Sequence, residues 1–174
     1  MGRETVTVHI PALRRYARAL TGDTWAADDL VQDTLERACS RWRLWLAGTD
    51  LRAWLFTIMH NLFISQVRQD LRRSALVQAH DIDDVAHELA APDAALGTAI
   101  DLQRCLLRLP MEQRAVLLLV SMQDMSYAEV AKITGVPTGT VMSRLSRARE
   151  RMRELMQTPH DPVERNVPVL RRLK

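Results

Sequence analysis

A cluster of arginines occupies one predicted helix near the end of the chain. The cluster consists of Arg144, Arg147, Arg149, Arg151 and Arg153, with Ser143 and Ser146 among them. Guanidinium groups pair with phosphates and with guanine edges, and hydroxyl groups can bond to either. This combination of side chains predicts a surface that binds nucleic acid.

The same helix sorts its residues into an apolar stripe and a polar face, because successive helical residues are about 100° apart. The stripe consists of Val141, Leu145, Ala148, Met152 and Leu155. Ser143, Ser146, Arg147 and Glu150 point the opposite way, with Arg144 and Arg151 on one flank and Arg149 and Arg153 on the other. We expect the centre of this face to read bases in a major groove and its flanks to hold phosphates.

The residues just upstream predict how this helix is held. Ala131 is small enough for two helices to approach, Gly135 can take the positive φ of a tight turn, and Val141 can anchor the second helix in a core. Residues 127–153 therefore have the pattern of a DNA-binding helix-turn-helix. The alternative, a merely solvated arginine-rich face, leaves this turn pattern unexplained.

The whole chain predicts an all-α protein. It lacks the alternating β-branched runs of a sheet, and its 174 residues can form two small helical domains. No segment approaches the roughly 20 unbroken apolar residues of a membrane span, and no signal peptide is recognisable at the N-terminus. We therefore expect a cytoplasmic protein without membrane insertion.

The residues that usually form catalytic and metal sites are scattered. Cys39 and Cys105 stand alone and are interpreted as reduced, buried thiols. The histidines and cysteines show no ligand or nucleophile spacing, and there is no glycine-rich phosphate loop. The sequence therefore predicts no enzyme, no metal site and no cofactor. His60 is interpreted as structural or solvated.

Charge is segregated along the chain. Basic residues outnumber acidic ones in 1–73 and in 104–157, whereas 74–103 contains no Lys or Arg. The acidic residues of this middle segment are Asp81, Asp83, Asp84, Glu88, Asp93 and Asp101. We predict an N-terminal domain (1–73), an acidic flexible linker (74–98), a C-terminal domain (99–157) and a flexible tail (158–174).

Three helices are expected before the linker. The first begins at Pro11, the second is capped by Asp23 or Thr24 and runs to Trp45, and the third spans 51–73. The residues expected to face inward from the third helix are Leu51, Trp54, Leu55, Ile58, Leu62 and Val67. Trp54 is expected in the core, whereas Trp45 could equally stack on an unpaired base.

Three segments in order carry a family resemblance. They are ADDLVQDTLERA (27–38), LRAWLFTIMHNLFISQVRQDLRR (51–73) and LPMEQRAVLLLVSMQDMSYAEVAKITGVPTGTVMSRLSRARERMREL (109–155). Together they resemble a bacterial extracytoplasmic-function (ECF) sigma factor of the sigma-70 family. The resemblance implies that the first domain binds core RNA polymerase and opens the minus-ten element of promoter DNA. It also implies that the last domain reads the minus-thirty-five element.

The resemblance assigns polymerase binding to the second helix. The matching positions are Asp28, Asp29, Leu30, Val31, Gln32 and Asp33. An acidic face suits a basic helical hairpin on the polymerase. Without the resemblance, these carboxylates could be explained by the positive end of the helix dipole alone.

The resemblance also assigns the DNA contacts. Asn61 matches a position that recognises a flipped-out base near minus ten, although a bare Asn could be a buried amide or a solvated residue. Arg68, Arg72 and Arg73 would hold the single strand, unless they serve only solubility. Ser143, Ser146 and Arg147 match positions that contact minus-thirty-five bases, and Arg144 and Arg149 match phosphate contacts. Arg114 is expected to support the first helix of its domain or to bind a phosphate.

The chain departs from the family pattern at two recognition positions. Met142 stands where many relatives carry a basic residue, and Ser146 stands where some have an aromatic one. The promoter sequence therefore cannot be copied from relatives. The family further implies an anti-sigma factor as partner.

Two other classes of function compete with this interpretation. A conventional helix-turn-helix regulator would explain residues 127–153 but not the Asp28–Asp33 segment or Asn61. A sigma-like decoy would bind a regulator without touching DNA, which the intact arginine set argues against.

Overall fold

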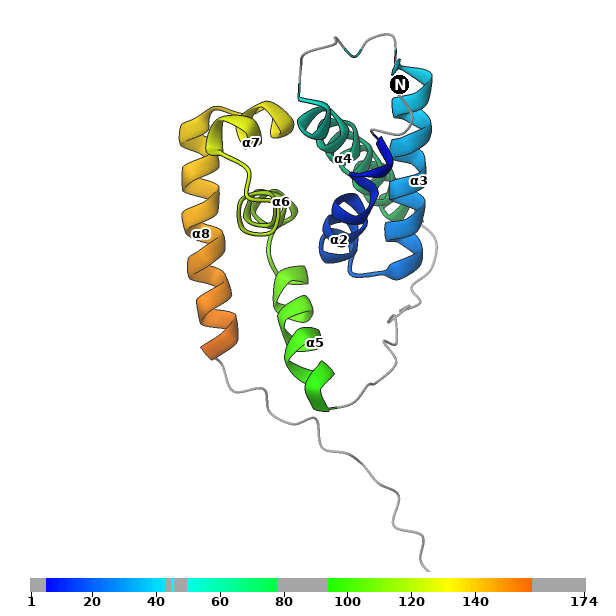
Figure 1. Ribbon diagram of the computed structural model, residues 1–174. Helices are drawn as coiled ribbons and strands as arrows, with labels where there is room; N and C mark the ends of the chain where they lie inside the picture. Colours follow the sequence, from blue (N-terminus) through cyan, green and yellow to red (C-terminus); the bar gives the residue numbers. More distant parts are fainter. Residues whose placement is uncertain (1–5, 43–44, 46–49, 78–93, 158–174) are drawn as a thin grey trace, which may run out of the picture.

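The computed structural model describes residues 6–42, 45, 50–77 and 94–157 and is helical, with no strand in these ranges. Its labelled helices are α2 (Ile10–Thr21), α3 (Thr24–Ser40), α4 (Leu51–Val77), α5 (Ala94–Leu107), α6 (Met111–Ser121), α7 (Tyr127–Thr134) and α8 (Thr138–Gln157). Helices α2–α4 form an N-terminal unit and α5–α8 a C-terminal unit (Figure 1). The predicted all-α, two-part organisation is confirmed.

Local sequence signals set the ends of the first helices. A proline lies in the first turn of α2, and Gly22 ends this helix with a φ of 76°. Asp23 then caps α3, since its side chain accepts a hydrogen bond of 2.8 Å from the Ala26 N–H. Asp23, rather than Thr24, is therefore the cap.

Helix α3 ends earlier than expected, at Ser40 instead of Trp45. Just beyond this end Trp42 and Trp45 pack together, with ring centroids 5.0 Å apart, and Trp42 also contacts Trp54 edge-on at 6.2 Å. Trp54 is half-buried and packs on the core, as predicted.

Helix α4 lies between α3 and α7, so its buried surface is wider than one amphipathic stripe. Leu51 and Leu55 are buried as expected, but Phe56, Met59 and Phe63 are buried too. The helix continues to Val77, and α5 already begins at Ala94. Both helices therefore extend into the predicted linker (74–98), of which 78–93 lie outside the described residues.

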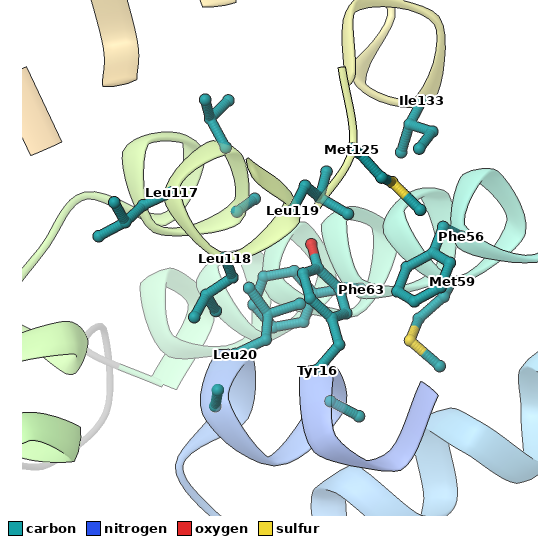
Figure 2. Packing of buried hydrophobic residues seen from close by; sticks show 14 of the residues in the cluster. Tyr16, Leu20, Phe56, Met59, Phe63, Leu117, Leu118, Leu119, Met125 and Ile133 are labelled. Carbon is teal, nitrogen blue, oxygen red and sulfur yellow. The ribbon is translucent and has the colours of Figure 1, made fainter. Parts of the chain in front are cut away.

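The two units pack against each other through one continuous apolar core. Figure 2 shows Tyr16 and Leu20 of α2 and Phe56, Met59 and Phe63 of α4 beside Leu118 and Leu119 of α6. Met125 and Ile133 complete this contact from the α6–α7 turn and α7. The domains are therefore in contact in this structure, which charge segregation alone did not predict.

Polar side chains also bridge the two units. The Arg114 guanidinium donates to the Leu20 carbonyl across the interface at 2.7 Å, and to the carbonyls of Leu106, Leu107 and Leu109 within its own unit. Gln103 Nε2 donates to the Ala19 carbonyl at 3.1 Å. Arg114 was expected either to support the first helix of its unit or to bind a phosphate. In the structure it supports that helix, α5, through these hydrogen bonds.

The two cysteines differ in environment. Cys105 is buried as expected, but Cys39 is exposed, because it follows the buried Ala38 and falls on the outer side of α3. No described helix is long and apolar enough to cross a bilayer.

Candidate nucleic-acid interface

Helices α7 and α8 form a helix-turn-helix, and local hydrogen bonds cap both ends of α7. Ser126 and Glu129 make a reciprocal capping box, with the Ser126 N–H donating to Glu129 Oε2 at 2.7 Å. These bonds lower the pKa of Glu129. Gly135 ends α7 with a φ of 70° and donates its N–H to the Ala131 carbonyl at 2.9 Å. The predicted glycine turn is confirmed.

The apolar stripe of α8 faces the core as predicted. Its buried residues are Val141, Leu145, Ala148, Met152 and Leu155. Ser143, Ser146 and Arg147 on the opposite side are exposed, and so is Arg149 on the flank. The hydroxyl of Ser143 donates to the Thr140 carbonyl at 3.0 Å, which holds it against the first turn of the helix. This exposed face can present hydrogen-bonding groups to a major groove.

Arg144 has a different environment from the other arginines of α8. Its Nη2 lies 2.5 Å from Glu112 Oε2 of α6, and its side chain is only 22% exposed. His60 of α4 lies close enough to Arg144 and Glu112 for both charges to affect its pKa. Its pKa is lowered to about 4, mainly by burial and further by Arg144, against an opposing effect of Glu112. Arg144 therefore borders the contact between the two units, and His60 is structural rather than solvated.

The N-terminal unit presents a second polar surface along α4. Asn61, Arg68, Arg72 and Arg73 are all exposed. At about 100° per residue, Arg68 and Arg72 each lie within roughly 20° of Asn61, whereas Arg73 is turned away from Asn61 by about 120°. The structure therefore brings three of these residues onto one stripe, with an amide near its start and cations further along.

The acidic segment of α3 divides into exposed and buried members. Asp28, Asp29, Gln32 and Asp33 are exposed, whereas Leu30 and Val31 are buried in the core. The exposed members carry intramolecular contacts of their own: Arg14 lies 3.9 Å from Asp28, and Gln66 Nε2 of α4 donates to Asp33 Oδ2 at 3.3 Å. Only the four exposed residues can present atoms to a partner in this structure.

Two exposed apolar side chains lie beside these surfaces; Trp25 was not singled out from sequence, and Met142 was noted only as a departure from the family pattern. Trp25 is 84% exposed in the first turn of α3, and Met142 is 52% exposed on α8. The signal was present in both cases, because each residue falls outside the apolar stripe of its helix. A helical projection alone would have identified them.

The surfaces lie on different sides of the molecule. Figure 1 shows α8 at one edge and α3 at the other, with α2, α4 and α6 between them. The fold and these surfaces define an all-helical DNA-binding protein with a helix-turn-helix in its C-terminal unit and an acidic face in its N-terminal unit.

Family models match both units in order. The sigma2 domain of PhyR matches residues 6–60, and sigma-70 region 4 matches residues 99–152. The ECF RNA polymerase sigma factor EcfG of Rhodopseudomonas palustris is 34% identical over 157 residues, which cover 88% of this chain and 84% of the relative. SigM of Mycobacterium tuberculosis, also an ECF RNA polymerase sigma factor, is 35% identical over 85% of this chain and 73% of its own length.

Solved structures agree with this assignment. The sigma factor RpoE of Bartonella quintana, solved with the anti-sigma factor NepR, has a TM-score of 0.74 and 35% identity over 90% of this chain and 97% of its own. CnrH, solved with the cytosolic domain of CnrY, has a TM-score of 0.65 and 27% identity over 88% and 85%. The chain belongs to the ECF family of RNA polymerase sigma factors, the class that directs promoter-specific initiation of transcription. A conventional helix-turn-helix regulator is not favoured, because both sigma regions are matched.

Proposed function

We propose that this chain binds core RNA polymerase through the exposed face of α3 and recognises promoter DNA through α4 and α8. One observation supports the proposal most directly. The exposed polar and cationic faces of α4 and α8 lie on the two units that match sigma2 and region 4, respectively. The polymerase surface consists of Asp28, Asp29, Gln32 and Asp33, whose charge suits a basic partner. Leu30 and Val31 hold this helix in place from the core.

The α4 stripe fits an unpaired minus-ten strand. Asn61 offers an amide to the edge of a flipped base, and Arg68 and Arg72 follow on the same side to pair with successive phosphates. Arg73 would contact the strand only if the strand bends around the helix. The α8 face fits the minus-thirty-five duplex, with Ser143, Ser146 and Arg147 toward bases and Arg149 toward a phosphate.

Reading both elements at once requires the two units to separate. The elements are named for positions about 25 base pairs apart, which corresponds to roughly 85 Å of duplex at 3.4 Å per step. In the packed arrangement α4 contacts α7, the first helix of the helix-turn-helix. We therefore propose that the units part when polymerase is bound. An anti-sigma factor would hold them in an inactive arrangement; the similar sigma factor RpoE was solved in complex with the anti-sigma factor NepR.

Run-off transcription tests this proposal. Core polymerase with and without the full chain would be compared on a genomic fragment library, together with Asn61→Ala, Arg147→Ala and the control Arg108→Ala. Arg108 is an exposed arginine between α5 and α6, outside both proposed DNA surfaces. We expect new start sites with the parent and the control, and a loss of at least tenfold with the other two variants.

The alternatives predict different results. A chain that acts as a decoy would bind an anti-sigma factor yet produce no start site with core polymerase. If start sites appear but Asn61→Ala and Arg147→Ala behave as the parent, the sites are wrong although the function is right.

A further inference from the structure

Met142 is an apolar side chain in a polar, cationic surface. It is 52% exposed near the start of α8, directly after the buried Val141. Its exposed neighbours on the helix are Ser143, Ser146 and Arg149. A half-exposed thioether lacks part of the free energy of burial, which a ligand could restore.

A hollow in the surface adjoins Met142. It has a volume of about 490 Å³ and is lined by Tyr127 of α7 and by Met142, Leu145, Ser146, Arg149, Glu150 and Arg153 of α8. On the helix, Met142, Ser146, Arg149 and Arg153 lie within a sector of about 60°. Arg147 lies roughly 140° from Met142. The hollow therefore combines apolar side chains with two arginines and one carboxylate, so its net positive charge favours a polyanion that carries a local apolar group over a neutral apolar partner.

The chemistry of the major groove limits what Met142 can contact there. Every base edge in that groove offers hydrogen-bond donors or acceptors, and the C5-methyl group of thymine is the apolar feature. A methionine side chain donates no hydrogen bond and is only a weak acceptor. It is also unbranched and adaptable, so it can follow a methyl group at the groove floor. Residues at the N-terminal end of a recognition helix are the ones that reach base edges.

We propose that Met142 is a specificity-determining residue that packs against a thymine C5-methyl group in the minus-thirty-five element, while Arg149 holds a phosphate on the same side. The inference rests on the proposed promoter recognition by α8. Because Arg147 points in a different direction, the thymine lies at a different base pair from the one that Arg147 reads. Met142 supplies no cation, so its contact adds base preference without adding salt dependence.

Deoxyuridine substitution tests this contact at the level of one methyl group. Holoenzyme assembled from core polymerase and the full chain would be bound to a promoter identified by run-off transcription. Each thymine of the minus-thirty-five region would be replaced singly by deoxyuridine, which lacks only the C5-methyl. We expect one replacement to weaken binding by the parent about three- to fivefold, the effect of burying one methyl group. The same replacement should leave binding by Met142→Ala unchanged.

Two further variants sharpen the test. Met142→Leu keeps an apolar tip and should keep the deoxyuridine penalty. Met122→Ala removes a comparably exposed methionine outside α8 and should bind all duplexes as the parent does. The parent and Met142→Ala should also share the same dependence of binding on salt concentration.

Each contrary outcome has its own meaning. If no thymine replacement is coupled to Met142, although the holoenzyme binds the promoter, the inference is overturned and the proposed function stands. If Met142→Ala instead weakens assembly with core polymerase, Met142 belongs to a protein contact and the inference is likewise overturned. If the holoenzyme recognises no promoter, the proposed function itself fails.

Discussion

One guanidinium nitrogen of Arg52, on α4, donates two hydrogen bonds to Gln123 in the turn between α6 and α7. Its Nη2 donates to the Gln123 carbonyl oxygen at 2.5 Å and to Oε1 of the same side chain at 3.1 Å. Gln123 is only 2% exposed, and its Nε2 donates onward to the Ala12 carbonyl of α2 at 3.4 Å. A single buried amide therefore joins two helices of the N-terminal unit to the C-terminal unit.

Removing one member of this contact should weaken the packing of the units. Arg52→Met leaves the buried Gln123 amide and carbonyl without their donor, which costs about 1–3 kcal/mol. We expect a corresponding loss in the free energy of unfolding measured with urea, and faster hydrogen exchange in α2. Arg108→Met, at an exposed position, is the control and should change stability by less than about 0.5 kcal/mol. Equal losses for the two variants would mean that the contact contributes nothing specific.

Three glycines should respond differently to alanine. Gly22 and Gly135 both have positive φ, 76° and 70°, which costs an L-residue about 1–2 kcal/mol. A Cβ on Gly22 would also lie 2.6 Å from Leu107 Cδ1 of α5, whereas Gly135 and the helical Gly139 face open space. We expect Gly22→Ala to destabilise most, Gly135→Ala less, and Gly139→Ala to stabilise by up to about 1 kcal/mol. Thermal unfolding would establish the order, and equal losses at Gly22 and Gly135 would exclude a role for the Leu107 contact.

The C-terminal unit was the part most predictable from sequence. The apolar stripe of α8 and the glycine turn are both local patterns, because side-chain direction in a helix follows from residue number alone. The same logic correctly separated Ser143, Ser146 and Arg147 from the buried residues. Their contacts with DNA stay predictions.

The contact between the units was not predictable in the same way. Gln123 and Arg52 are 71 residues apart, and neither lies in a pattern that marks a long-range partner. Leu30 and Val31 were assigned to polymerase binding as part of a matched segment, yet they are buried. A motif identifies a segment, whereas the tertiary environment decides which of its side chains remain at the surface.

Tyr16 has a buried hydroxyl group that makes no hydrogen bond among the described residues. Its ring packs edge-to-face on Phe56 at 5.3 Å. Tyr16→Phe keeps this ring contact and removes an unsatisfied polar group, so we expect a gain of about 1 kcal/mol in the free energy of unfolding at pH 7.

The same substitution has a predictable pH dependence. Burial raises the pKa of Tyr16 above its ordinary value of 10.0, so the folded state favours the neutral phenol. The parent should therefore lose stability as the pH rises above 10, where the unfolded chain ionises first. Tyr16→Phe should lose less over this range in urea titrations at pH 9 and pH 11. Parallel losses in the two proteins would show that the phenol is hydrated in solution.

His60 should make the fold sensitive to acid. Its folded-state pKa is lowered from 6.5 to about 4, so its contribution is fully present above pH 6.5 and is lost as the pH falls toward 4. We expect a loss of about 3 kcal/mol over this range. His60→Leu cannot titrate, so the difference in stability between parent and variant should depend on pH only in this window. A constant difference from pH 7 to pH 4 would contradict the assignment.

The ion pair between Arg144 and Glu112 determines whether Arg144 can contact DNA. Arg144 was predicted to bind a phosphate, but its guanidinium lies against Glu112 and is largely shielded. If the guanidinium turns to a phosphate when α8 enters the groove, it must first leave Glu112.

Glu112→Gln removes the competing charge and should then strengthen promoter binding by the holoenzyme about two- to fivefold at low salt, by analogy with other surface ion pairs. Arg144→Ala should reduce the slope of log affinity against log salt by about one. Asp101→Asn, which alters the exposed pair with Arg104 on α5, is the matched control and should leave both quantities unchanged. If Arg144→Ala lowers the stability of the chain but not the salt slope, Arg144 is a structural residue of the unit contact and the phosphate role is wrong.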